Sequence, residues 1–275
     1  MARSPKSRNR AKRRKNPPLQ GLPAFITGTA LAFFGDPESR VVRTTKWLTG
    51  LLLLPVCWIL FETFVVLLQS DTLAGHYWRT REFAFFGLGA AAWLVLFFLA
   101  RCRAMLWLYV AGHELTHALF VLICRGKVGR VHVSSSGGHI LTNRNNFLIS
   151  LSPYFFPFYS AVVVAGWVLL CWVVAEQARP DPVWLYGLIG FTWSFHFSFT
   201  VWMILREQPD VEQNGRLFSF TVIFAANLLL ICGMIVVASP TATFPGFFAT
   251  FWENLRTFVP RLLETAREVY GDIPR

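Results

Sequence analysis

Long runs of apolar residues with little or no charge follow one another along this 275-residue chain. A helix rises about 1.5 Å per residue, so roughly 20 such residues cross the hydrocarbon core of a bilayer, which is about 30 Å thick. Charged residues make up 15% of the chain, whereas an average soluble protein carries roughly 25%. The sequence therefore predicts an all-α polytopic membrane bundle rather than a soluble fold.

The apolar runs predict about six transmembrane helices, at residues 47–69, 83–100, 104–124, 147–175, 183–205 and 217–238. Arg101, Cys102 and Arg103 separate the second run from the third. A single helix through both runs would be about 60 Å long, twice the thickness of the hydrocarbon core, so we expect a tight turn there. Both five and six crossings satisfy the positive-inside rule, so the side of the membrane that the next loop faces stays open.

The regions on either side of the predicted transmembrane domain, residues 47–238, differ in composition. Residues 1–19 are strongly basic and predict a disordered tail, and residues 20–46 predict an interfacial lead-in because their apolar run is short and interrupted by Gly and Pro. In residues 239–275, apolar residues recur at three- and four-residue steps with Arg and Glu between them. This pattern predicts a C-terminal amphipathic helix on the membrane surface, bent at Pro260.

The net charge of +11 is unevenly placed, because residues 1–15 are rich in Lys and Arg and contain no acidic residue. The positive-inside rule then predicts a cytoplasmic N-terminus for an integral, multi-pass membrane protein. Asn-Pro-Pro at 16–18 stands where a signal peptide would have its apolar core, so no signal peptide is expected. The tail suits contact with anionic lipid headgroups, whereas nucleic-acid binding is not expected because no aromatic residue lies between the charges.

One loop, residues 125–146, has the residue pattern of β structure. Val128, Val131 and Val133 precede a Ser- and Gly-rich stretch at 134–138, and the apolar residues at 140 and 141 follow it. β-branched residues on either side of such a turn are typical of paired strands. We therefore expect a short β-hairpin after the third transmembrane helix.

The third apolar run contains the sequence His113-Glu114-Leu115-Thr116-His117. Residues four apart lie on one face of a helix, so both imidazoles can bind one Zn²⁺ at about 2.0 to 2.1 Å while Glu114 acts on a zinc-bound water. The flanking residues are apolar, and an ionised Glu at membrane depth costs roughly 2.5 to 3.5 kcal/mol. A metal supplies partners for all three groups, so we expect a zinc site; the alternative is a polar patch that other helices stabilise without metal.

Cysteine is not expected to hold this metal. The five cysteines lie inside or at the ends of apolar runs, are odd in number and form no Cys-x-x-Cys pair. Such cysteines are typical of small buried apolar residues rather than of disulfides or zinc ligands. The remaining metal ligand is therefore expected to be a His, Asp or Glu.

Residues 111–118, Ala-Gly-His-Glu-Leu-Thr-His-Ala, resemble the site-2 protease family of intramembrane zinc metalloproteases, and so, less specifically, do the hairpin and Ser-Leu-Ser-Pro at 150–153. The resemblance covers roughly residues 104–238. Members of that family take a third ligand, an Asp, from a later core helix. The family's Leu-Asp-Gly motif is absent in that form, and Gln-Pro-Asp-Val-Glu-Gln-Asn-Gly at 208–215 fills its place. The resemblance therefore implies Asp210 as the third zinc ligand.

Asp210 also fits another role, because Gln213 three residues later completes a capping-box pattern at a helix N-terminus. Glu212 and His196 are rival ligands, although hydrogen bonding across helices is the default role for a lone His at membrane depth. Glu62 is expected to pair with an Arg or to line a polar path. Solvated or structural roles in the loop are expected for His132 and His139. Hydrogen bonding between helices is the default role for Asn146 and Asn227, either of which could instead orient a substrate carbonyl.

The resemblance implies a zinc metalloendopeptidase that hydrolyses peptide bonds of membrane-embedded substrates, which are transmembrane proteins or peptides. Glu114 is expected to take a proton from the zinc-bound water and to return it to the leaving amine. An extended substrate segment is expected to pair with the hairpin. Two other classes of function stay open: a non-proteolytic member of the same fold that binds a membrane partner, and a transporter with a buried His and Glu site.

Overall fold

The computed structural model describes residues 40–69, 77–100, 103–135, 137–206, 208–239 and 242–271. The predicted basic tail at 1–19 lies outside the described residues, as do the lead-in up to residue 39 and two members of the predicted turn, Arg101 and Cys102. Within the described residues the chain is helical apart from one two-stranded sheet. The predicted class, a helical bundle with one hairpin, is therefore correct.

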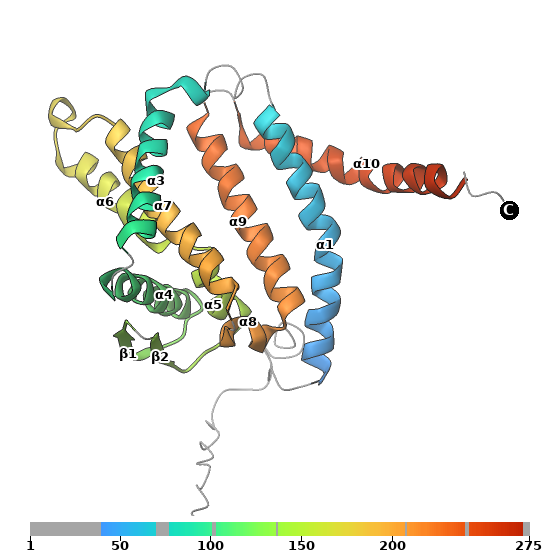
Figure 1. The fold of residues 1–275 in the computed structure, drawn as a ribbon, viewed down its shortest axis with the longest axis horizontal. Coiled ribbons are helices and arrows are strands. Elements are labelled where there is room, and N and C mark those ends of the chain that lie inside the picture. Colours follow the sequence, from blue (N-terminus) through green and yellow to red (C-terminus); the bar gives the residue numbers. More distant parts are fainter. Residues whose placement is uncertain are drawn as a thin grey trace, which may run out of the picture.

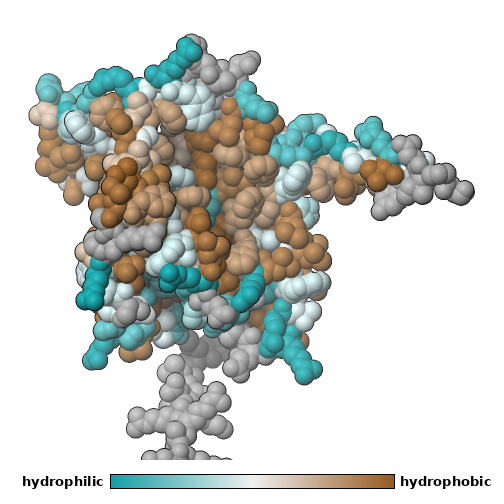
Figure 2. Space-filling model, in the orientation of Figure 1, coloured by the Kyte–Doolittle hydropathy of each residue, from teal (hydrophilic) through white to brown (hydrophobic). Residues whose placement is uncertain are grey.

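Four described helices are long and apolar enough to cross a membrane: α1 (Arg40–Gln69), α3 (Arg81–Ala100), α4 (Arg103–Ile123) and α9 (Arg216–Ala238). Many of their apolar side chains face outward; Leu52 of α1 is 71% exposed and Leu99 of α3 is 81% exposed. In Figure 2 hydrophobic residues cover the middle of the bundle, and hydrophilic residues gather at its upper and lower ends. This distribution is compatible with a multi-pass membrane protein, because lipid is the favourable neighbour of such a surface.

The helix predicted for residues 147–175 is broken, so that prediction was wrong. The segment forms α5 (Phe147–Leu151), a short 3₁₀ helix η3 (Ser152–Tyr154) and then α6 (Phe158–Val173), with a bend of 81° between the two parts. Pro153 and Pro157 account for the break, because proline lacks a backbone N–H and its ring clashes with the preceding turn of a helix. The bent pair adds a fifth crossing only if its two parts are one span.

The prediction of about six crossings is not confirmed. Helix α7 (Val183–Ile204) occupies the predicted position, but it does not count among the described helices apolar enough to span a membrane. Its apolar residues are interspersed with Trp, Ser and Thr and with His196, which lower its mean hydropathy. Helix α1 also begins at Arg40 rather than at residue 47. Helices α3 and α4 are separate, as expected.

Close helix pairing builds the body of the bundle. Helices α3 and α7 lie against each other, and a Cβ atom at Gly89 would collide with the carbonyl oxygen of Gly187, as one at Gly190 would with that of Phe86. Small residues that let two backbones approach are typical of helix pairs in membranes, where packing rather than water exclusion drives association. Helices α1 and α9 form the second pair, alongside the first in Figure 1.

The two ends of the bundle carry different elements. At the lower end in Figure 1, α4 runs across the end of α7, beside α5, α8 (Pro209–Asn214) and the hairpin of β1 (Val128–Ser134) and β2 (Gly137–Thr142). The strands are antiparallel, with Val131 opposite Ile140, so the predicted hairpin is confirmed. At the other end, α10 (Phe244–Gly271) extends away from the bundle. The short helices η2 (Tyr77–Arg79) and η4 (Glu176–Ala178) precede α3 and α7.

Helix α10 is amphipathic and continues through Pro260. Phe247 near its start is buried against α1 and α9, while further apolar side chains, including Trp252 and Leu262, are exposed. The predicted amphipathic helix is therefore present. Its contact with a membrane surface stays a prediction.

Candidate metal centre

Helix α4 supplies two histidines on one face. His113 and His117 are one turn apart, and their side chains are 11% and 10% exposed. Gly112 lets α4 approach the ring of Tyr159, because a Cβ atom there would lie 2.7 Å from that ring. The helix is therefore buried on the side that carries the motif, and the two imidazoles point into the protein rather than into lipid.

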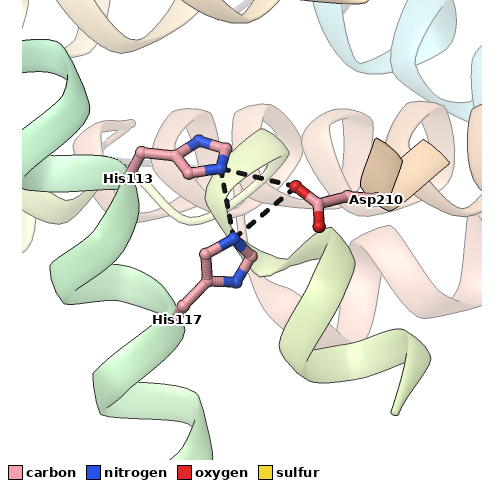
Figure 3. Close-up of side chains that lie close together, drawn as sticks. All are labelled: His113, His117 and Asp210. Carbon is pink, nitrogen blue, oxygen red and sulfur yellow. Dashed lines mark hydrogen bonds and ion pairs between the residues drawn. The ribbon is translucent and has the colours of Figure 1, made fainter. Parts of the chain in front are cut away.

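Helix α8 brings a carboxylate to the same place. Gln208 is extended, Pro209 begins α8, and Gly215 ends it with a φ of 85°, a backbone conformation that favours glycine. These residues turn the chain sharply between α7 and α9, so that Asp210 lies in the first turn of a short helix. Figure 3 shows Asp210 pointing toward both imidazoles from the side opposite α4.

The three side chains converge through one atom each. Oδ2 of Asp210 lies 3.5 Å from Nε2 of His113 and 3.6 Å from Nε2 of His117. The two Nε2 atoms are 3.1 Å apart. Ligand atoms that bind zinc tetrahedrally at about 2.0 to 2.1 Å are about 3.3 Å from one another. The observed spacing therefore fits a tetrahedral metal with one open position.

The hydrogen bonds of the histidines leave the converging nitrogens free for a metal. Nδ1 of His117 donates to the carbonyl oxygen of Ile149 at 2.8 Å, so Nε2 of the neutral ring presents a lone pair. Nδ1 of His113 lies 3.3 Å from the hydroxyl of Tyr109. Metal-bound histidines in proteins almost always donate their other ring N–H in this way. If Nδ1 of His113 likewise donates its hydrogen to Tyr109, both Nε2 atoms offer a lone pair to a cation beside the Asp210 oxygen.

Asp210 is held by a buried tyrosine. The hydroxyl of Tyr154, a residue with no exposed surface, donates to Oδ2 at 3.3 Å. Burial alone would raise the pKa of the Asp210 carboxyl, but hydrogen bonds and charge from His113 and His117, when their facing nitrogens carry a proton, outweigh burial and hold the pKa well below its usual range. A metal ion in place of that proton would favour the ionised carboxylate in the same way, and an ionised carboxylate is what a metal ligand has to be.

Glu114 lies beside these residues but is not one of the converging ligands. Its side chain is buried under β2, where a Cβ atom at Gly138 would lie 2.6 Å from Cγ of Glu114 and 2.8 Å from its Oε1. Only glycine leaves this space at position 138. The hairpin therefore covers the carboxylate that the sequence singles out as a base.

The structure does not support the rival assignments. The N-cap of α8 is Gln208, without a side-chain cap, so Asp210 lies inside the helix and is not its cap. Glu212 pairs with Arg216 at 3.1 Å on the surface. His196 lies on α7 and is not part of the converging group.

The other polar residues named from the sequence make structural contacts, although Asn146 caps its own helix rather than bonding between helices. Glu62 pairs with Arg261. His132 and His139 face each other across the two strands. Asn146 caps α5, and Asn227 donates to the carbonyl oxygen of Tyr154.

The sequence did not identify the residues that support the ligands. Tyr109 stands four residues before His113, so helix spacing could have indicated it. Ile149 and Tyr154 reach the site because the chain breaks at the two prolines, and the continuous helix that we predicted hid them. Asn214 donates to the backbone carbonyl oxygen of Asp210 at 2.8 Å, and no signal in the sequence indicated this contact.

Comparison with protein-family models, with curated proteins and with solved structures found no match for this chain.

Proposed function

We propose that this protein is an intramembrane zinc metalloendopeptidase that hydrolyses peptide bonds of membrane-embedded substrates. One observation carries the proposal: His113, His117 and Asp210 converge at tetrahedral spacing, with Glu114 next to them on a helix apolar enough to span a membrane. Two histidines and a carboxylate are the ligand set of several zinc peptidases. The fourth position of such a site is free for water or for the substrate carbonyl.

The three converging residues would hold Zn²⁺. A zinc ion in such a site lowers the pKa of water toward about 7 and polarises a carbonyl group. Glu114 accepts the proton of the attacking water and passes it to the amine that leaves. Tyr154 keeps Asp210 oriented, and the backbone carbonyl of Ile149 keeps His117 in the tautomer that presents Nε2.

The hairpin is suited to an extended substrate segment. A transmembrane helix shields its own peptide bonds with hydrogen bonds, so the substrate has to unwind near the cleavage site. Strand β2 lies against the motif helix and covers Glu114, and in the described sheet it pairs with β1 alone. A substrate that adds a strand to this small sheet would satisfy its unwound backbone beside the base.

The test is cleavage of a library of single-span transmembrane peptides reconstituted with the protein in liposomes, read by mass spectrometry together with zinc content. Glu114→Gln keeps the shape of the side chain but removes the base, so zinc stays bound at about one per chain while cleavage falls by roughly 10²- to 10⁴-fold. His113→Ala and His117→Ala lose both zinc and cleavage. Glu212→Gln is the matched control, because this surface carboxylate pairs only with Arg216 among the described residues, and it leaves both readouts unchanged.

A wild-type protein that holds no zinc under metal-replete conditions, or a Glu114→Gln variant that cleaves as fast as the wild type, would contradict the proposal. Loss of zinc in Glu114→Gln would mean that Glu114 holds the site together rather than acting on water.

A further inference from the structure

A small cavity lies between α4, the start of α6 and α7, on the side of His113 that faces Tyr109. Its volume is about 20 Å³, and about 10 to 15 Å³ is enough for one water molecule. Tyr109 and His113 form one wall, Phe156 and Tyr159 another, and Phe195 and His196 of α7 the third. A proposed metal ligand is therefore part of the wall of a space that has room for one small molecule.

One residue in the wall of this cavity has a buried polar atom without a partner. His196 is 9% exposed, and its Nε2 atom has no hydrogen-bond partner among the residues that the structure describes. The great majority of buried polar side-chain atoms in proteins are hydrogen-bonded, either to protein or to ordered water. An imidazole with this burial, lining a cavity of this size, points to a bound molecule.

The hydroxyl group of Tyr109 is a hydrogen-bond donor at the same cavity. With a metal on Nε2, the neutral ring of His113 carries its hydrogen on Nδ1 and donates it to the hydroxyl oxygen of Tyr109, an assignment that depends on the proposed function. The hydroxyl hydrogen of Tyr109 then has no acceptor among the described side chains and carbonyls. The hydroxyl of Tyr159 is already used, because it donates to the carbonyl oxygen of Leu108 at 2.6 Å.

The two groups are complementary partners for one water. Tyr109 offers a hydrogen, and a neutral His196 can accept one from the water on its unprotonated ring nitrogen. The aromatic walls make a charged ligand unfavourable, because an ion here would lose its hydration without gaining a counter-charge. A water needs two to four polar partners, and these residues supply them.

We propose that the cavity holds one water molecule bound by Tyr109 and His196. A chain of hydrogen bonds then runs from the metal ligand His113 through Tyr109 and this water to α7. His196 is thus a positioning residue, which acts on the metal site through the water rather than as a ligand.

The experiment is X-ray radiolytic labelling of the full-length, zinc-loaded protein in detergent, in which radiolysis of a bound water oxidises the side chains beside it. Tyr159 and Phe195 are expected to be labelled in the wild type and several-fold less in His196→Leu. His196→Gln restores the labelling, because an amide can hold the water. His139→Leu, the same substitution in the exposed hairpin, leaves the labelling at the wild-type level.

Zinc affinity is the second readout. Residues that hydrogen-bond directly to metal ligands are worth about 10- to 100-fold in affinity. His196 acts one step further away, through the water and Tyr109, so His196→Leu is expected to lower zinc affinity severalfold, by less than about tenfold, with recovery in His196→Gln. Absent labelling in the wild type, or equal labelling in His196→Leu, overturns the water site. Unchanged zinc affinity in a His196→Leu variant that has lost the labelling overturns the positioning role. If the protein binds no zinc, the proposed function fails, and the labelling still decides whether the water is there.

Discussion

The two ends of the α1–α9 helix pair are held together by different kinds of contact. At the end near the metal centre, the buried side chain of Lys46 donates to Asn214 at 2.8 Å, and Asn214 donates to Ser150 at 2.6 Å. These bonds join α1, α8 and α5 directly behind Asp210. At the end near α10, the core consists of apolar side chains packed together: Leu60, Leu228, Cys232, Val236 and Phe247.

Hydrogen bonds and apolar packing differ in how strictly they define position. A hydrogen bond between buried groups requires a donor, an acceptor and a narrow range of distance and angle, and a lost partner is costly. Apolar contacts are non-directional, so such a core tolerates small shifts. Directional contacts occur at the α10 end too, where Asn254 donates to the buried Thr63 at 3.1 Å. The contacts at the metal end differ in that they hold the segment that carries Asp210. Substitutions at the metal end should therefore change function, whereas substitutions at the α10 end should change stability alone.

Asp210→Asn is expected to have the largest effect. Asn has nearly the same size and shape as Asp but offers a far poorer, neutral oxygen to a metal. Zinc affinity should fall by more than about 100-fold, beyond the range for residues that only support a ligand. Isothermal titration with zinc measures this change, and full zinc occupancy with wild-type cleavage would show that Asp210 is not a ligand.

Asn214→Leu should affect both stability and the metal. It leaves Lys46 and Ser150 without their partner, and a buried group left unsatisfied costs about 1 to 3 kcal/mol of unfolding free energy. Asp210 also loses the hydrogen bond to its backbone carbonyl, so zinc affinity should fall by about tenfold. Detergent unfolding curves and zinc titration measure the two changes.

A double variant separates these two effects. Lys46→Met combined with Asn214→Leu removes both buried polar groups, which should recover much of the stability without recovering zinc affinity. Recovery of stability and zinc affinity together would mean that Asn214 supports the fold in general and has no particular role in placing Asp210.

Leu228→Ala, at the apolar end, should reduce stability and leave the metal site unchanged. Leu228 is 6% exposed within the apolar cluster. The expected cost is about 2 kcal/mol, the low end of the range for such a change in soluble cores, because lipid rather than water surrounds the unpacked helix. Unfolding in detergent measures the loss, and a parallel loss of zinc affinity would show that the two ends are coupled.

The sequence predicted those features of the fold and site that depend on residues close together in the chain. The spacing of His113 and His117, the hairpin after them and the amphipathic α10 each follow from residues within one element. Asp210 comes from a segment distant in the sequence, and no periodicity connects it with α4; only the family resemblance pointed to it.

Pro153 and Pro157 indicate the break after α5, because neither can continue a helix from the preceding turn, whereas the length of the apolar run by itself predicts one continuous helix. The hydrogen bonds of Asn214 and Tyr154 depend on packing between several helices, so no local pattern contains them. The same holds for the cavity at His196, because its walls come from three separate elements.

Glu62→Gln should have the smallest effect. Arg261 of α10 contacts both carboxylate oxygens of Glu62 on α1, at 3.2 and 2.8 Å. The side chain of Arg261 remains 48% exposed and that of Glu62 23% exposed. Ion pairs with this exposure contribute about 0 to 1 kcal/mol, because water screens them in both states. The indole of Trp58, which donates to Glu62 at 3.0 Å, can keep its hydrogen bond with the amide oxygen of Gln.

We therefore expect Glu62→Gln to lower the unfolding free energy by less than about 1 kcal/mol, with α10 still in place because Phe247 anchors it in the apolar cluster. Distances between spin labels on α1 and α10 report the position of the helix. Glu264→Gln is the matched control, since this carboxylate of α10 has no ion-pair partner in the described part of the chain. Glu62→Gln could instead lower the unfolding free energy several times more than Leu228→Ala does, or release α10 from the bundle. Either result would mean that an ion pair rather than apolar packing holds the α10 end, and the proposed difference between the two ends would be wrong.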